Sequence, residues 1–337
     1  MIINKKIKSN LDMIINCLFI CIISVCLLIG IYYYTQVSKY SNESNIYVTI
    51  TENNSDENEL SSIVGKIGEK NKIQHILTLN HNAQYSLAYY DETSKKVYYM
   101  TNEDSNRHGG DQLFCYDTIL KTNNQITKDL FGANYIIPVN TNKLFMVVAK
   151  KNTHTLEPVY INVKNGKVIG INCDDDLFVN VATKDNSQGE IYISGYSNLE
   201  DYKMLDKCNS TDKEQMYGID NTVYKVKNNQ LEKMFTLSDR FIDSFAVNEN
   251  YIICNTSLRG TGSNYNSKLY LFDINLGEIN ELKNKIEDSI FALDNKMNVL
   301  VNTGSKIKKI NIKTGKLETL LTIDSNKAWI NNANNYQ

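Results

Sequence analysis

Five segments of the chain repeat one pattern: a strand of alternating apolar residues, a turn, and a second alternating strand. The turn falls on glycine or asparagine in each copy, and these residues tolerate the left-handed backbone that tight hairpins need. Apolar alternation with period two indicates a β-strand. The repeat therefore predicts an all-β protein built from successive hairpins. The copies are LFCYDTILKTNNQIT (Leu113–Thr127), VYINVKNGKVIGI (Val159–Ile171), VYKVKNNQLEKMF (Val223–Phe235), LYLFDINLGEINEL (Leu269–Leu282) and IKKINIKTGKLETLL (Ile307–Leu321), with turns at Asn124, Gly166, Asn229, Gly277 and Gly315.

A second pair of predicted strands precedes each hairpin, so that one unit holds four strands. A weaker copy opens the series, with predicted strands at 45–50 and 72–80 and a turn at residue 71. The turns lie about 49 residues apart on average, within the range of propeller repeats. Four strands joined as a meander are the content of one propeller blade. The preceding pairs span 85–101, 135–150, 177–197, 241–256 and 290–303.

These units resemble the blades of the extracytoplasmic β-propellers related to TolB and YncE. The resemblance rests on a strand such as VYYMT (Val97–Thr101), a variable loop, a strand such as LYLFD (Leu269–Asp273) and a glycine turn. It covers residues 45–324. The Ser-Pro-Asp-Gly turn of TolB blades is absent, as are WD and GH dipeptides. The resemblance therefore implies an architecture and leaves the function open.

Six units predict a six-bladed propeller. N-terminal strands often complete the last blade of such a ring, which removes open sheet edges. Here the N-terminal piece is expected to supply two outer strands, and the tail 327–337 is expected to supply an inner strand. The polar insertion Thr51–Asn71 is expected to be a flexible loop with one short helix around Leu60–Ile67. Because this is little material for a complete blade, a five-bladed or imperfectly closed ring remains the alternative.

The N-terminal residues differ in kind from the repeats. Lys5, Lys6 and Lys8 precede an uncharged apolar stretch that is long enough to cross a bilayer as a helix. The positive-inside rule then places the N-terminus in the cytoplasm and the repeats outside the cell. No A-x-A cleavage site follows the stretch, which favours an uncleaved signal-anchor over a cleaved signal peptide. The predicted organisation is a cytoplasmic stub at 1–12, a transmembrane helix at 13–35, a linker at 36–44, the propeller at 45–326 and a tail or closing strand at 327–337.

Charge and cysteine content exclude some functions. The formal net charge is −2, which gives no electrostatic reason for binding nucleic acid. Three of the 7 cysteines lie in the apolar stretch, and the others are scattered without a C-x-x-C pair. No zinc or redox motif is therefore encoded locally. Cys115 and Cys254 are expected to be small apolar strand residues; the disulfide state of these two and of Cys173 and Cys208 is left open.

Two motifs invite a catalytic interpretation. HGGD (His108–Asp111) lies between the second and third predicted strands of its unit, where the connections are polar and vary in length. We interpret it as a surface turn. GYSNL (Gly195–Leu199) begins like the G-x-S-x-G nucleophile elbow, but Leu199 stands where the motif has glycine. The sequence therefore assigns no catalytic and no cofactor-binding residue.

Carboxylates raise the question of a metal. CDDD (Cys173–Asp176) lacks the spacing of a calcium loop and is more typical of an acidic surface turn. Four aspartates lie on or beside predicted inner strands, where a metal-dependent propeller enzyme of the lactonase or lyase type would gather its ligands. They are Asp91, Asp174, Asp243 and Asp294. A Ca²⁺ site therefore remains an open expectation, without assigned ligands.

These observations predict a single-pass membrane protein with an exported propeller. Its expected function is non-catalytic: a binding or scaffold module for a protein, a peptide or an envelope ligand. The prediction depends on analogy and on the missing catalytic motifs, because a fold alone does not determine a function. The alternative is a metal-dependent propeller enzyme.

Overall fold

The structure is a computed structural model of the 337-residue chain. It describes Val25, Leu27 and residues 45–53, 60–68, 71–81, 87–101, 110–150, 155–185, 188–210, 215–260 and 266–336. The chain divides into two compact units, of which Asn45–Tyr336 is the larger and is described below. The predicted stub, transmembrane helix and linker lie outside the described residues, apart from Val25 and Leu27. No helix among the described residues has the length and apolar character of a membrane span.

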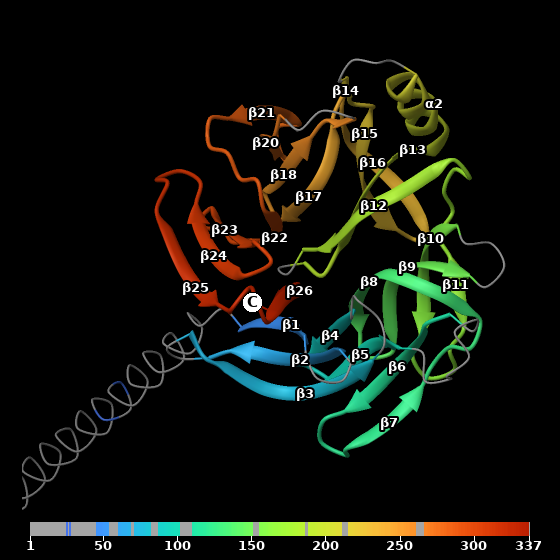
Figure 1. Cartoon of the computed structure of the whole chain (residues 1–337), viewed down its shortest axis with the longest axis vertical. Helices are drawn as coiled ribbons and strands as arrows, with labels where there is room; N and C mark the ends of the chain where they lie inside the picture. Colours follow the sequence, from blue (N-terminus) through green and yellow to red (C-terminus); the bar gives the residue numbers. More distant parts are fainter. Residues whose placement is uncertain are drawn as a thin grey trace, which may run out of the picture. The chain divides into compact units, whose positions relative to one another are not determined.

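Six four-stranded antiparallel sheets form the blades of a propeller (Figure 1). The prediction of an all-β, six-bladed propeller is thereby confirmed. From the inner to the outer strand, blade 1 contains β26 (Ala328–Tyr336), β1 (Asn45–Asn53), β2 (Leu60–Ile67) and β3 (Ile73–His81); blade 2 contains β4 (Ala88–Asp91), β5 (Lys96–Thr101), β6 (Gln112–Asp117) and β7 (Thr122–Gln125); blade 3 contains β8 (Leu130–Asn140), β9 (Lys143–Lys150), β10 (Leu156–Asn162) and β11 (Val168–Gly170). Blade 4 contains β12 (Leu177–Lys184), β13 (Ile191–Ser197), β15 (Asn221–Lys227) and β16 (Gln230–Leu237); blade 5 contains β17 (Phe241–Val247), β18 (Tyr251–Ser257), β20 (Lys268–Asp273) and β21 (Glu278–Leu282); blade 6 contains β22 (Ser289–Leu293), β23 (Asn298–Asn302), β24 (Lys306–Asn311) and β25 (Leu317–Thr322).

Blade 1 closes the ring with strands from both ends of the repeat region. Figure 1 shows the red strand β26 beside the blue strand β1, and the two pair antiparallel from Asn45↔Tyr336 to Glu52↔Ala328. The expectation of a short helix at Leu60–Ile67 is wrong, because these residues form β2 between β1 and β3. With β2, blade 1 has four strands, so the alternative of a five-bladed ring is excluded.

The described residues form seven hydrophobic core clusters, of which six lie one at each junction between neighbouring blades. The seventh contains Tyr196, Cys208, Tyr217, Ile219 and Phe241. In β9, Leu144, Met146 and Val148 pack toward blade 2, whereas Phe145 and Val147 pack toward blade 4. Both faces of each sheet are therefore buried. This arrangement explains the continuous apolar run LFMVVA, since a strand covered on both faces loses the polar half of its alternation.

The cysteines behave as predicted for strand residues. Cys115 lies in the cluster between blades 2 and 3, and Cys254 lies in the cluster between blades 4 and 5. Burial raises the pKa of the Cys115 thiol to about 11. Cys173 and Cys208 are also free thiols, so these four cysteines form no disulfide with one another.

The predicted turn positions have the expected left-handed backbone in all units but one. The φ angles are +67° at Gly166, +60° at Asn229, +72° at Gly277 and +72° at Gly315. Asn124 is an exception, because it lies within β7, and Lys121 (φ +57°) occupies the turn instead. The turn of blade 2 lies three residues earlier than predicted because the longer connection in this blade left its position ambiguous in the sequence.

Candidate functional site

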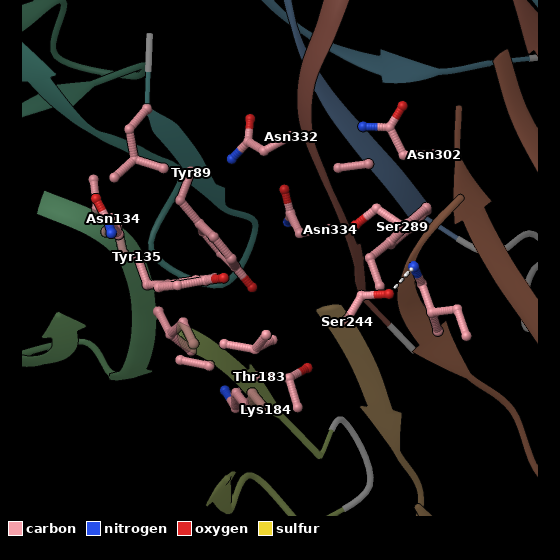
Figure 2. Close-up of a pocket in the computed structure, with 18 of the residues that line it drawn as sticks. Tyr89, Asn134, Tyr135, Thr183, Lys184, Ser244, Ser289, Asn302, Asn332 and Asn334 are labelled. Atoms are coloured by element: carbon pink, nitrogen blue, oxygen red, sulfur yellow. Dashed lines mark hydrogen bonds between the residues drawn. The ribbon is translucent and has the colours of Figure 1, made fainter. Parts of the chain in front are cut away.

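A cavity of about 490 Å³ occupies the centre of the ring and is the candidate site. Every inner strand contributes to its wall, so the site exists only because the ring is closed. Figure 2 shows the wall from within. The residues used below are Tyr89 from β4, Asn134 and Tyr135 from β8, Thr183 and Lys184 from β12, Asp243 and Ser244 from β17, Ser289 and Phe291 from β22, Asn302 from β23, and Asn331, Asn332, Asn334 and Asn335 from β26.

β-Bulges shape the wall. One extra residue interrupts the pairing at Asn134 in β8, Asn180 in β12, Asp243 in β17, Phe291 in β22 and Asn331 in β26. A bulge re-aims the extra side chain and increases the local twist. Four of these five residues line the cavity. The bulges therefore bring polar groups to a position that period-two alternation does not provide.

Hydrogen bonds between neighbouring blades run around the whole ring. In most of them a side chain donates to a backbone carbonyl of the next inner strand. These bonds satisfy carbonyl groups at the free edge of the inner strand, where no further strand pairs with it. The donors and acceptors are Asn332 Nδ2 to Ala88 O (2.7 Å), Gln112 Nε2 to Leu130 O (2.7 Å), Tyr135 Oη to Asn180 O (3.0 Å), Asn180 Nδ2 to Ile242 O, Ile290 N to Ser244 Oγ (2.9 Å) and Asn302 Nδ2 to Ile330 O (3.2 Å). This belt fixes the wall and gives Asn180, Asn302 and Asn332 a structural role.

Two tyrosines on adjacent inner strands present their rings to the cavity. Figure 2 shows Tyr89 and Tyr135 directed into it from blades 2 and 3. The hydroxyl of Tyr135 donates to Asn180 O, which fixes the ring. Burial raises the pKa of Tyr135 to about 12, so the hydroxyl stays protonated at neutral pH. This part of the wall is a rigid aromatic surface.

The two charged side chains of the wall are both engaged by the protein. Lys184 Nζ donates to Pro138 O at 2.9 Å, and burial lowers its pKa. Asp243 accepts from Ser257 Oγ at 2.9 Å. Its side chain is open to the cavity, yet the surrounding protein displaces enough water to raise the carboxyl pKa. The wall therefore offers one carboxylate and one tethered ammonium among mainly uncharged groups.

Asparagines of β26 hold buried amide atoms without a hydrogen-bond partner among the described residues. They are Asn332 Oδ1, Asn334 Nδ2 and Asn335 Oδ1. Asn335 is 4% exposed. An unpaired buried polar atom costs about 1–3 kcal/mol. Such groups are rare in folded proteins, and three of them on one strand of the cavity wall make this strand a candidate for ligand contact.

Three of the four aspartates considered as metal ligands serve turns instead. Asp91 accepts from Thr93 N and Ser94 Oγ, and Asp174 accepts from Asp176 N. Asp294 accepts from Lys296 N and Asn298 N. Of the four, only Asp243 lines the cavity. Within the described parts of the chain, no three His, Cys, Asp or Glu side chains are grouped as metal ligands would be.

The remaining motifs also have structural roles where they are described. Ser197 is the N-cap of helix α2 (Asn198–Asn209), where its Oγ accepts from Glu200 N at 3.0 Å. Asp176, the last residue of CDDD, accepts from Ser197 Oγ and from Leu199 N. In HGGD, Asp111 N donates to Phe131 O at 2.9 Å, at the predicted place between β5 and β6. His108 itself lies outside the described residues.

An insertion between the second and third strands of blade 4 was not predicted from the sequence. Helix α2 follows β13, and strand β14 (Met216–Tyr217) pairs with β19 (Arg259–Gly260) from the equivalent connection of blade 5. Arg259 holds the insertion in place: Nη1 donates to Tyr196 Oη at 2.9 Å and lies 3.6 Å from Asp201 Oδ2. Its guanidinium carbon lies 3.9 Å from the centre of the Phe241 ring. The short strands carry no periodicity by which they could be recognised.

No protein-family model and no curated protein matches the chain. Solved structures match its fold. A chain of a nidogen/laminin complex has a TM-score of 0.54 and 8% identity, over 87% of this chain and 98% of that one. TolB from Acinetobacter baumannii has a TM-score of 0.51 and 14% identity, over 85% of this chain and 63% of that one. A TolB protein from Agrobacterium tumefaciens has a TM-score of 0.51 and 8% identity, over 88% of this chain and 100% of that one.

At these identities the likeness is one of fold. The architectural resemblance to TolB that the repeats indicated is thereby confirmed. The fold alone does not determine a function, which depends on the side chains of the cavity.

Proposed function

We propose that the chain is a membrane-anchored, extracytoplasmic binding module for a protein, peptide or other envelope ligand, with the central channel as its binding site. The observation that carries the proposal is the composition of the channel wall. It combines two tyrosine rings, of which Tyr135 is fixed by a hydrogen bond, with amide atoms that have no partner among the described residues. Ligand sites are commonly concave, aromatic and supplied with a few placed polar groups. A propeller in a nidogen/laminin complex supports a protein partner as one form of this function.

A non-catalytic role is supported by what the candidate catalytic residues do. Ser197 caps a helix, and Asp91, Asp174 and Asp294 cap turns. Acyl transfer needs a nucleophile beside a base, and metal chemistry needs converging ligands. In the described wall Asp243 is the only carboxylate, and the hydroxyl that donates to it belongs to Ser257, which is not a lining residue. No three metal-ligating side chains are grouped among the described residues. Recognition needs neither arrangement.

Blocking the channel is expected to abolish ligand binding. Ser289 begins β22, is exposed and lines the cavity, so Ser289→Trp fills the channel without entering the core. In the unaltered full chain, a ligand at about 100 times its Kd adds about 2.7 kcal/mol of stability, which raises Tm. The probes are trialanine, cellobiose and lactose, measured by thermal unfolding in a detergent without a sugar headgroup. The Ser289→Trp variant is expected to show no rise.

The matched control is Thr319→Trp, on the exposed outer strand β25, which should keep the rise in Tm. A rise that persists in Ser289→Trp would move the site away from the channel. No rise with any probe would contradict the proposed channel site. A rise with Ca²⁺ alone that EDTA reverses would favour the metal-dependent alternative.

Membrane anchoring is part of the proposal and has a separate test. Residues 13–35 contain no Asp, Glu, Lys or Arg. Arginine at the centre of a membrane helix costs about 2.5–3.5 kcal/mol by insertion scales. Ile22→Arg combined with Ile23→Arg is therefore expected to release the chain from membranes washed at alkaline pH. Gln36→Arg, beyond the stretch, should stay bound; equal release of both variants would contradict the anchor.

A further inference from the structure

The unpaired amides of β26 and the tyrosine rings belong to one cavity. Asn332 Oδ1, Asn334 Nδ2 and Asn335 Oδ1 are enclosed and have no partner among the described residues, and all three residues belong to the wall of the cavity. Tyr89 and Tyr135 enter it from blades 2 and 3 (Figure 2). The χ2 angle of asparagine is soft, so a small rotation turns the amides of Asn334 and Asn335 toward a bound group. Asn332 stays held by its Nδ2, which donates to Ala88 O at 2.7 Å, and only its Oδ1 is left to pair. The cavity therefore combines flat apolar faces with polar groups of both hydrogen-bonding senses.

The free amide atoms favour hydroxyl groups as partners. Two of them are acceptors and one is a donor. A hydroxyl donates and accepts at once, so one hydroxyl can pair with an amide oxygen and with a neighbouring amide nitrogen. A peptide group has its donor and acceptor on opposite sides of a rigid plane, which makes it a poorer match to clustered amides. A ring that carries several hydroxyls therefore matches the free amide atoms of β26 better than a peptide backbone does.

The charges of the wall favour a neutral ligand. Asp243 exposes its carboxylate to the cavity, and it would repel an acidic group confined with it. The ammonium of Lys184 is engaged by Pro138 O. A carboxylate also accepts hydrogen bonds from hydroxyls. An uncharged polyol is therefore favoured over a sugar acid.

We propose that the channel binds an uncharged pyranose sugar of one or two residues. The apolar C–H face of the sugar packs on Tyr89 and Tyr135, and its hydroxyls pair with Asn332, Asn334 and Asn335. Asp243 accepts a further hydroxyl. The cavity of about 490 Å³ lies within the range of small-molecule sites. This inference rests on the proposed binding function and narrows its ligand.

Calorimetry on the full chain, again in a detergent without a sugar headgroup, tests the inference. The probes are cellobiose, lactose and N,N′-diacetylchitobiose, with glucuronic acid and trialanine as comparison ligands. At least one neutral disaccharide is expected to bind more tightly than either comparison ligand. Tyr135→Leu is expected to weaken binding by about tenfold, because it removes a stacking surface. Asn334→Leu is expected to weaken it by about fivefold.

The controls separate loss of contact from loss of fold. Tyr135→Phe keeps the ring and should keep most of the affinity, while Tyr202→Ala, on the exposed face of α2, should change nothing. Tm of each variant shows whether it is folded. Binding of trialanine without any disaccharide would overturn the sugar inference and leave the binding function standing. Disaccharide binding that Tyr135→Leu, Asn334→Leu and Ser289→Trp all leave unchanged would overturn the site and the inference together.

Discussion

Removal of residues 328–337 is expected to destroy the cooperative unfolding of the propeller. The deletion takes away β26, which is the inner strand of blade 1 and pairs with β1 along its length. It also removes Ala328 and Ile330 from the cluster between blades 6 and 1. Loss of one buried isoleucine costs about 2–5 kcal/mol, and a whole domain has about 5–15 kcal/mol of net stability. The exposed edge of β1 then becomes a site for aggregation.

Urea unfolding followed by far-UV circular dichroism measures this loss, since the sole tryptophan, Trp329, leaves with the deleted strand. Deletion of Gln337 alone is the control, because it removes no residue of β26. A synthetic peptide with the sequence of residues 328–337 should restore cooperativity when it is added to the shortened chain. An unchanged unfolding midpoint after the deletion would show that the ring does not depend on β26.

The repeats made most of the fold readable from sequence, and the failures are local. Gly166, Gly277 and Gly315 mark turns because only a left-handed residue closes these hairpins. β2 was missed because its strand character comes from pairing on both sides rather than from its own residues, which include Ser61, Ser62 and Gly65. The pairing with β1 and β3 determines that β2 is a strand, and this pairing cannot be recognised in a single sequence.

The channel was less readable than the blades. Asp91 and Asp294 occupy the same place at the end of an inner strand, which made them look like channel ligands. In this position they cap the next turn, as Asn140 and Asn248 do in blades 3 and 5. Asp243 lines the cavity because it is the extra residue of a bulge, and bulges have no signature in the alternation.

The role of several asparagines could not be predicted from the sequence for a related reason. In the structure, Asn180, Asn302 and Asn332 connect neighbouring blades through carbonyls of inner strands. These partners come from separate blades, and a contact of this kind depends on ring closure. Their role therefore became visible only with the ring assembled.

Gly166→Ala is expected to destabilise the propeller more than the equivalent change at Gly277. Both glycines have left-handed backbone, with φ of +67° and +72°. Either alanine therefore incurs the left-handed penalty of about 1–2 kcal/mol. At Gly166 the new Cβ would also lie 2.1 Å from Ile126 O of the preceding blade, whereas no atom lies within 4 Å at Gly277. This overlap adds about 1–3 kcal/mol.

Asparagine variants separate the two contributions, because asparagine tolerates left-handed backbone but still carries a Cβ. Asn229 occupies the equivalent turn of blade 4 with φ of +60°. Gly277→Asn is therefore expected to leave the free energy of unfolding nearly unchanged. Gly166→Asn should still lose the free energy that the overlap with Ile126 O costs, about 1–3 kcal/mol. Trp329 fluorescence during urea unfolding reports all four variants. Equal losses in the free energy of unfolding at the two positions would mean that Ile126 moves away from the new Cβ at little cost. Blades 2 and 3 would then be packed less tightly at this turn than in the structure.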